Sequence, residues 1–234
     1  MNDSYADVQF AEKRSYADWG LKLESINLSF PEAKVEQIDI PGANGILDLS
    51  EVNGQICYKN RTLTLGFSLM DDYVEWHDLS SQIARVLHGK AIRCILPDDP
   101  NYYYDGRFSL QTSKDNDVNA DFVIVGDVYP FKLECYTAAE DWLWDPFSFE
   151  HGIIRAYNGI SVSGEETLKI VGSDMPVVPE ITCSETMNVE FENQTFQLAK
   201  GTNKNYDVIL KEGENIMKFT GNGTVTIDFR GGIL

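Results

Sequence analysis

The sequence lacks long apolar runs, a surplus of basic residues and most of the motifs that mark enzymes. No stretch reaches the roughly 18 apolar residues that a membrane-spanning helix requires. Only 19 Lys and Arg face 37 Asp and Glu, which gives this chain of 234 residues a formal net charge of −18. Because a surface of that sign repels phosphate, the composition argues against a protein that reads DNA or RNA sequence.

A targeting segment and closely spaced cysteines are also missing. Residues 1–5 carry neither the basic start nor the apolar stretch of a signal peptide, so we expect synthesis in the cytosol. Cys57, Cys94, Cys135 and Cys183 lie far apart, which excludes CxxC metal and redox motifs. We therefore expect reduced thiols, most of them buried as small apolar side chains.

Histidines are too few and too scattered for most catalytic or metal-binding schemes. His77 and His88 fall on one predicted helix, about 16 Å apart along its axis, and His151 lies in a different segment. No dinucleotide-binding, phosphate-binding, GxSxG or HExxH motif occurs. The sequence therefore predicts no catalytic residue, no cofactor and no metal site.

Two polar strings still invite a functional interpretation. Residues 115–121 alternate oxygen-bearing side chains like the first half of a calcium loop, but Ala120 replaces the turn glycine and Gly126 replaces the bidentate Glu. The tip of a hairpin is the simpler interpretation. Tyr102–Tyr104 could stack on a sugar, but packing within and beside a strand is the simpler role for them.

Alternation with period two dominates the chain and predicts a mainly β fold. Thr62–Leu69, for example, places Leu63, Leu65 and Phe67 on one face. Hairpin connections are predicted at 192–193, 211–213 and 221–223. Further strands are predicted at 21–28, 35–40, 91–96, 103–111, 121–128, 188–191, 195–198, 206–210, 214–219 and 223–229.

One segment instead has helical spacing and predicts an α-helix at about residues 73–88. Trp76, Leu79, Ile83, Val86 and Leu87 recur along one face. Asp72 with Glu75 forms a possible capping box before the helix, and Gly89 is a possible left-handed terminator after it.

The organisation of the chain changes near its middle. Periodicity is lost and aromatic residues gather in residues 137–152, which we interpret as a connection. Residues 1–136 then form an N-terminal domain, described as a β-sandwich or barrel-like fold with one helix. Residues 153–234 have short strands with regular turn signals, which predict a small antiparallel sandwich.

Several motifs in the first domain, in this order, resemble one known family. They are Trp19–Leu21, Ile40–Leu49, Tyr58–Leu63, the helix end Leu87–Lys90, Tyr102–Arg107 and Pro130–Lys132. Together they resemble the amino-terminal domain of distal tail (Dit) proteins of long-tailed, siphovirus-type bacteriophages and prophages of Gram-positive bacteria, over about residues 19–135. Residues 210–219 and 225–232 resemble strands of the family's carboxy-terminal galectin-like sandwich.

This resemblance implies a structural virion protein and no enzymatic reaction. Such a protein is made in the host cytoplasm and forms a hexameric ring at the distal end of the tail. The ring joins the tail tube protein to the baseplate or to other tail-tip proteins. DNA would pass through the lumen of the ring without being read.

Residues 35–60 are the expected subunit contact. They are too rich in glycine and turn residues for a central strand, yet they carry many apolar side chains that a neighbouring subunit could bury. Arg61 could bind Asp48 of its own chain or a carboxylate of a neighbour. The candidate interface residues are Ile38, Ile40, Pro41, Gly42, Gly45, Leu47, Asp48, Leu49 and Arg61.

Two other classes of function remain open. The first is a carbohydrate-binding module, in which the C-terminal galectin-like domain binds a host cell-surface saccharide through Tyr157 or Tyr206 on a concave face. Neither His nor Trp follows residue 151, so the sugar-binding residues of galectins cannot be transferred to this chain. The second is a glycosidase, which requires two carboxylates facing each other across a cleft.

Overall fold

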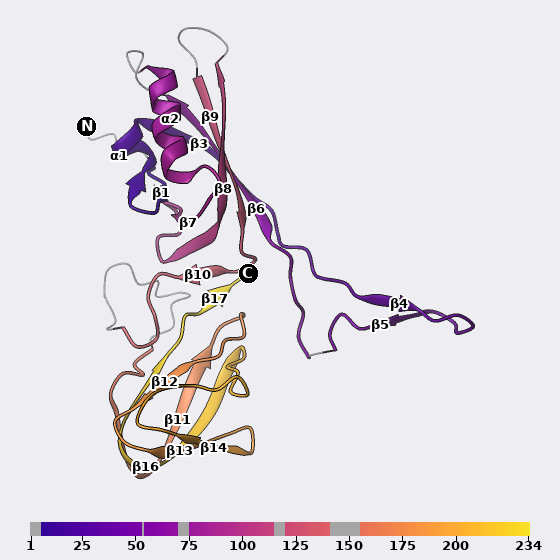
Figure 1. The fold of residues 1–234 in the computed structure, drawn as a ribbon, viewed down its shortest axis with the longest axis vertical. Coiled ribbons are helices and arrows are strands. Elements are labelled where there is room, and N and C mark those ends of the chain that lie inside the picture. Colours follow the sequence, from indigo (N-terminus) through magenta and orange to yellow (C-terminus); the bar gives the residue numbers. More distant parts are fainter. Residues whose placement is uncertain (1–5, 53, 70–74, 115–119, 141–154) are drawn as a thin grey trace. The chain divides into compact units, whose positions relative to one another are not determined.

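The computed structural model describes residues 6–52, 54–69, 75–114, 120–140 and 155–234. The chain divides into two compact units, residues 1–132 and 133–234, and each contains its own hydrophobic core. Strands form most of both units (Figure 1). The predicted mainly β fold class is confirmed.

The first unit is built on one antiparallel sheet. In β6 the alternation predicted from the sequence is observed, because Leu63, Leu65 and Phe67 are buried whereas Thr62 is exposed. The spatial order of the strands is β2 (Lys13–Arg14), β1 (Gln9–Phe10), β7 (Lys90–Ile95), β8 (Tyr102–Lys114), β9 (Ala120–Val128), β6 (Arg61–Leu69) and β3 (Leu21–Leu28).

Helix α2 (Trp76–Leu87) covers the core face of this sheet (Figure 1). It buries Leu79, Ile83 and Leu87, which recur every fourth residue. After the helix, Gly89 adopts φ 73° and donates its N–H to the carbonyl of Phe108 at 2.7 Å. The helix is therefore confirmed. Its predicted capping box is wrong for Glu75, because the helix begins at Trp76 and Glu75 is the extended N-cap residue, without a side-chain capping hydrogen bond. Asp72 and residues 73–74 lie outside the described residues.

A second helix, α1 (Ser15–Trp19), was not predicted, so the expectation of one helix in this domain is corrected. Its five residues are too few to show helical periodicity. Its start is fixed by Asp7, whose carboxylate accepts hydrogen bonds from the Tyr16 N–H at 2.7 Å and the Ser15 hydroxyl at 3.2 Å. Trp19 then stacks on Phe10 in the core.

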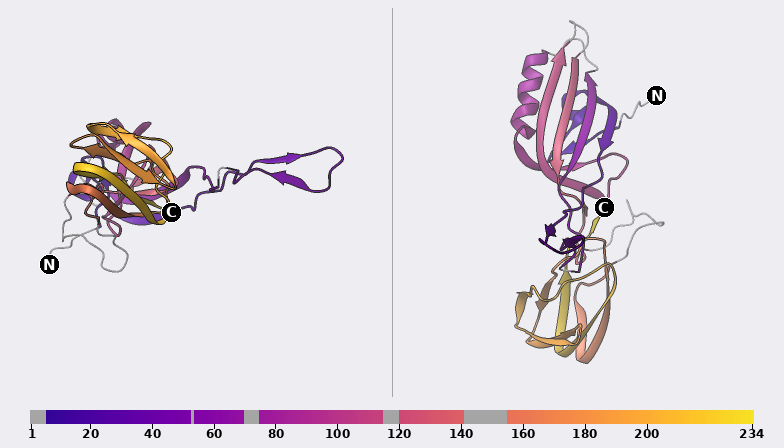
Figure 2. Two further views of the ribbon diagram at one scale, coloured as in Figure 1. Left: turned by 90° about the horizontal axis from the view of Figure 1, so that it is seen from below. Right: turned by 90° about the vertical axis from the view of Figure 1, so that its right-hand side faces the viewer.

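Strands β4 (Gln37–Asp39) and β5 (Ile46–Asp48) form a separate two-stranded sheet. This ribbon lies between β3 and β6 in the chain and projects away from the seven-stranded sheet of its unit (Figure 1 and the left view of Figure 2). A two-stranded ribbon has no second layer of its own, so its apolar side chains have little to pack against.

The second unit is a curled antiparallel sheet centred on β16 (Gly213–Asp228), which pairs along one edge with β11 (Ile160–Gly172). Its other edge pairs first with β13 (Met187–Phe191) and then with β12 (Glu180–Cys183). The remaining strands of this sheet are β14 (Gln194–Leu198), paired with β13, and β15 (Gly201–Lys204), paired with β12.

Three sequence predictions in this unit are wrong: the hairpin at 221–223, the strand at 206–210 and the hairpin at 211–213 that was to join that strand to 214–219. Residues 214–219 and 223–229 were expected to form a hairpin, but β16 runs through the predicted turn at 221–223 because β11 pairs with it on both sides of that point. Residues 206–210 are not a strand, and only Leu210 forms a bridge, with Val177. The turn at Glu192 and Asn193 between β13 and β14 is confirmed, with φ of 46° and 63°.

The segment that opens the second unit belongs to its fold. Strand β10 (Lys132–Glu134) pairs with β17 (Gly232–Ile233), and Ala138 is buried in the second core. The Ala138 N–H also donates to the carbonyl of Phe229 at 2.9 Å. Of the connection expected at 137–152, residues 141–152 lie outside the described residues.

Candidate subunit interface

Residues 32–52 and 54–60 form an extended β arm. Its stem is held by backbone hydrogen bonds, including Lys34 N–H to Cys57 carbonyl at 2.7 Å and Lys59 N–H to Glu32 carbonyl at 2.8 Å. Gly42 and Gly45 form the tip with φ of 86° and 80°, a conformation that disfavours other residues. The arm is thus a defined ribbon, although almost all of its residues are exposed.

The ribbon has one apolar face, which we define as Ile38, Ile40, Leu47 and Leu49. Ile38 pairs with Leu47, and side chains two residues apart on a strand share a face. Ile38, Ile40 and Leu47 are 45%, 44% and 46% exposed, and Leu49 is partly exposed. Apolar side chains concentrated on one face of an isolated ribbon are typical of a surface that another molecule covers.

The arm brings together eight of the nine candidate interface residues. Ile38, Ile40, Leu47 and Leu49 form the apolar face, whereas Asp48 points to the opposite face. There its carboxylate accepts hydrogen bonds from the Ser50 N–H at 2.9 Å and from Gln37 Nε2 at 3.0 Å. Bonds from Ser50 and Gln37 hold the pKa of Asp48 below its usual value.

Arg61 lies apart from the arm residues. It is the first residue of β6, and its side chain is on the buried face of that strand. The intrachain ion pair with Asp48 that the sequence allowed does not form, because Asp48 bonds to Ser50 and Gln37 instead. Arg61 is only 4% exposed, and its guanidinium carbon lies 5.2 Å from the centre of the Tyr104 ring. Within the described part of the chain, Nε and Nη2 of Arg61 have no hydrogen-bond partner.

Burial dominates the electrostatics of this pair. It lowers the pKa of Arg61 below its ordinary value, since desolvation disfavours the charged guanidinium. It also raises the pKa of Tyr104 to about 12, against the opposing effect of Arg61. Sequence reasoning had singled out Arg61 by its charge but could not show that it is buried.

The tyrosine run beside this pair does not form an open sugar platform. Tyr103 and Tyr104 are buried, and the Arg93 guanidinium covers the Tyr103 ring at 4.5 Å. Lys132 Nζ lies 4.5 Å from the centre of the Tyr102 ring and pairs with the Asp99 carboxylate at 2.6 Å. The packing role suggested by the sequence agrees with these contacts.

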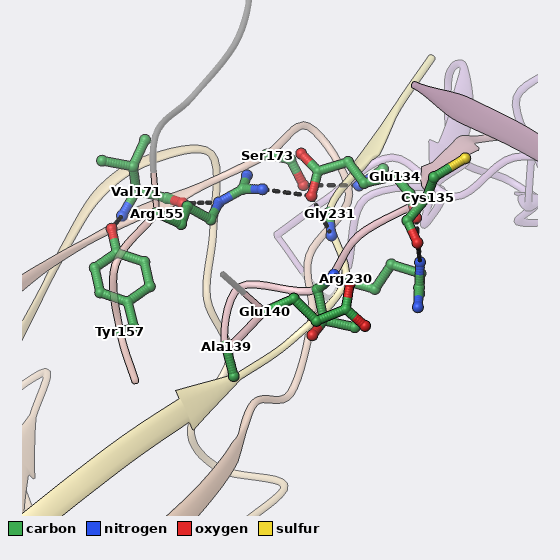
Figure 3. Close-up of polar contacts among 12 residues, drawn as sticks. Glu134, Cys135, Ala139, Glu140, Arg155, Tyr157, Val171, Ser173, Arg230 and Gly231 are labelled. Carbon is green, nitrogen blue, oxygen red and sulfur yellow. Dashed lines mark hydrogen bonds and ion pairs between the residues drawn. The ribbon is translucent and has the colours of Figure 1, made fainter. Parts of the chain in front are cut away.

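Glu134 and Arg155 are at the centre of a polar network in the second unit (Figure 3). Glu134 forms an ion pair with Arg155 and accepts the N–H of Gly231 at 3.0 Å. Arg155 also donates from Nε to the Val171 carbonyl at 3.2 Å, and its guanidinium lies over the Phe229 ring. The Glu134 carboxylate is thereby engaged in holding the start of the unit to its last residues.

The aromatic residues considered for sugar binding do not form a stacking surface together. Tyr157 is buried, stacks on Phe229 and accepts the Val171 N–H at its hydroxyl at 2.8 Å. Tyr206 is 74% exposed but lies in a turn after β15. Binding of a cell-surface saccharide remains a prediction from sequence without support from these side chains.

Within the described ranges, no group of three or more His, Cys, Asp or Glu side chains could hold a metal ion. His77 packs against Trp76, and His88 accepts the Leu110 N–H at Nδ1. Residues 115–119, which include most of the calcium-like string, lie outside these ranges, as does His151. No helix in the described part of the chain has the length and apolar character to cross a membrane.

Comparisons with known proteins support one fold assignment. No family model matches the chain, and no curated protein matches it by sequence. Among solved structures, it resembles the crystal structure of SPP1 Dit (gp 19.1), with a TM-score of 0.59 and 12% identity over 99% of this chain and 100% of that one. The chain has the Dit fold. The SPP1 structure is described as a paradigm of the hub adsorption apparatus in phages that infect Gram-positive bacteria.

The Dit fold extends over both units of the chain. The match therefore includes the second unit, in which the sequence motifs were less specific than in the first. At 12% identity the likeness concerns the fold, and the function must be argued from the surfaces described above.

Proposed function

We propose that this protein is a structural component of a phage tail, located in the hub at the distal end of the tail. The observation that carries the proposal is the likeness of the entire chain to a Dit protein described as a hub component. The absence of a recognisable catalytic arrangement among the described residues is compatible with this role. Its partners are the tail tube protein on one side and the baseplate or tail-tip proteins on the other.

We further propose that copies of the chain close into a hexameric ring. The apolar face of the arm supports a contact between copies, because burying it on a neighbour removes exposed Ile and Leu side chains from water. An arm that contacts a different surface of its neighbour makes a heterologous interface, and such an interface gives a ring when the rotation closes.

Charge opposes this assembly. Six subunits at −18 each carry a formal −108, so like charges must be screened by salt or directed outward and into the lumen. We therefore expect the ring to become more stable as salt rises from low to moderate concentration. An acidic lumen also suits a conduit for DNA, since phosphate gains little by adhering to its wall.

The test is multi-angle light scattering at low and moderate salt on the wild type and two double variants. Ile40→Asp with Leu49→Asp places two charges on the apolar face and should abolish the ring. The control, Asn44→Asp with Ile46→Asp, adds the same charge at the tip and on the opposite face, and this variant should still form the ring. Negative-stain images would establish six-fold symmetry.

Two results would count against the ring proposal. A wild type that is monomeric at every concentration and salt level shows that the subunits do not close into a ring by themselves. Equal ring formation by both double variants shows that the apolar face of the arm is not the contact.

A further inference from the structure

Among the described residues, no carboxylate pairs with the buried guanidinium of Arg61. Its side chain is almost fully enclosed, yet Nε and Nη2 have no partner among the described residues. Apart from burial, only Tyr104 acts on the pKa of Arg61, and Asp99, which acts on Tyr104, is itself paired with Lys132 at 2.6 Å. A buried charge without a counter-charge is costly, whereas a paired one is tolerated.

The arm carries free carboxylates next to an apolar surface. Its five acids, Glu32, Glu36, Asp39, Asp48 and Glu51, outnumber its two lysines, Lys34 and Lys59. Glu32 is paired with Lys59 and Asp48 is bonded to Ser50 and Gln37. Asp39 lies on the polar face with Asp48, and Glu51 lies beyond the ribbon.

Glu36 has the position that fits a subunit contact. It precedes Ile38 by two residues, and its carbonyl accepts the Leu49 N–H at 2.8 Å, which extends the ribbon by one pair. Its side chain therefore belongs to the same face as Ile38 and Leu49. It is exposed, and its carboxylate makes no hydrogen bond within the described chain.

We propose that Arg61 is a receiving site for a carboxylate of a second copy of this chain, and that Glu36 on the arm of that copy supplies it. The inference rests on the proposed ring and adds the polar contact that fixes the register of the arm on its neighbour. Arg61 is the first residue of the strand that follows the arm, so a neighbour's arm would bind beside the root of the receiving subunit's own arm. A neighbour's carboxylate would reach the guanidinium at Nη1, because Nε and Nη2 are fully buried.

The first test concerns the free subunit. Arg61→Met keeps an unbranched side chain on the Tyr104 ring and removes the charge. Because the charge is unpaired in the subunit, the melting temperature of the monomer should stay unchanged or rise. A fall would show that a group of the same chain already compensates the guanidinium, and it would overturn the proposal.

The second test concerns assembly, measured as the dissociation constant of the ring by sedimentation. Arg61→Met and Glu36→Gln should each raise that constant by about tenfold or more, as interfacial charge pairs do. The dissociation constant of the double variant should not exceed the larger of the two single-variant constants, because both changes remove the same contact. Glu32→Gln, on an exposed arm acid paired with Lys59, is the matched control and should leave the constant unchanged.

The outcomes separate this inference from the proposed function. Rings of unchanged stability in Arg61→Met or Glu36→Gln, or additive effects in the double variant, overturn the Arg61–Glu36 contact while leaving the ring intact. A wild type that stays monomeric overturns a second copy as the source of the carboxylate and also the intrinsic ring. The melting temperature of the monomer can be measured whether or not the wild type forms a ring.

Discussion

At the scale of single residues, two asparagines organise the turns of the second unit in the same way. The Nδ2 of Asn215 donates to the carbonyls of Ile170, Lys211 and Gly213, and its Oδ1 accepts the Lys211 N–H. Asn203 bonds in the same pattern four and two residues upstream and to Ile181 on the adjacent strand. The shared pattern Leu-x-x-Gly-x-Asn, at 198–203 and 210–215, is the sequence signal of these turns.

Asn215 is the more buried of the two and should matter more for stability. Asn215→Ala leaves buried carbonyls without a donor and should destabilise the second unit by about 1–3 kcal/mol. Asn203→Ala should cost less because water can reach its partners. Asn188→Ala, at an exposed position of β13, is the control and should change stability by less than about 0.5 kcal/mol.

The measurement is the urea midpoint of the second unit followed by circular dichroism, with an unchanged slope. Equal midpoints for Asn215→Ala and Asn188→Ala would show that the asparagine does not hold the turn.

At the scale of elements, the path of β16 decides the shape of the second unit. The strand pairs with β13 before Gly221 and with β12 after Gly223, so it bends where its partner changes. Gly221 and Gly223 have φ of 153° and 146°. A Cβ on Gly221 would lie 2.7 Å from the Cβ of Met187, so the bend also brings β16 close to the start of β13.

Gly221→Ala should therefore destabilise the second unit by about 1–3 kcal/mol, through steric overlap with Met187 and an unfavourable backbone angle. Thr220→Ala, at the exposed neighbouring position, is the matched control. Hydrogen exchange should show faster exchange in β13 and β16 of the Gly221 variant, with the first unit unaffected. Unchanged protection in both strands would contradict a tight approach at this glycine.

At the scale of the whole molecule, the division into units leads to a proteolysis experiment. Residues 137–152 lack periodicity, so limited proteolysis should cut there, within residues 141–152 in particular. Residues 133–140 are part of the second unit through Glu134, Arg155 and Ala138. The fragments should therefore separate under denaturing conditions but co-elute on a native column.

A fragment starting near residue 153 that elutes alone in its folded form would show that residues 133–140 are not needed to hold the unit together. Resistance of the chain to cleavage across 137–152 would instead argue against an accessible connection.

The sequence by itself determined those features that rest on local periodicity. Alternation located β3, β6 and β9, helical spacing located α2, and the ordered motifs indicated the Dit fold that the structural comparison supports. These predictions succeed because a half-buried strand or helix requires apolar residues at a regular spacing, and that spacing is visible in the sequence. The short helix α1 and the short strands β1 and β17 carry too few residues to do so.

Only the tertiary structure decided how distant segments pair and which charges are buried. The turn at 221–223 became the middle of a strand because β11, more than 40 residues earlier in the chain, pairs across it. The sequence predicted that Arg61 binds Asp48 or a neighbour's carboxylate. In the structure Arg61 is buried against Tyr104 on the core side of β6, and the Asp48 carboxylate accepts the N–H of Ser50 within the arm. Burial and pairing depend on contacts between residues far apart in sequence, which local patterns do not contain.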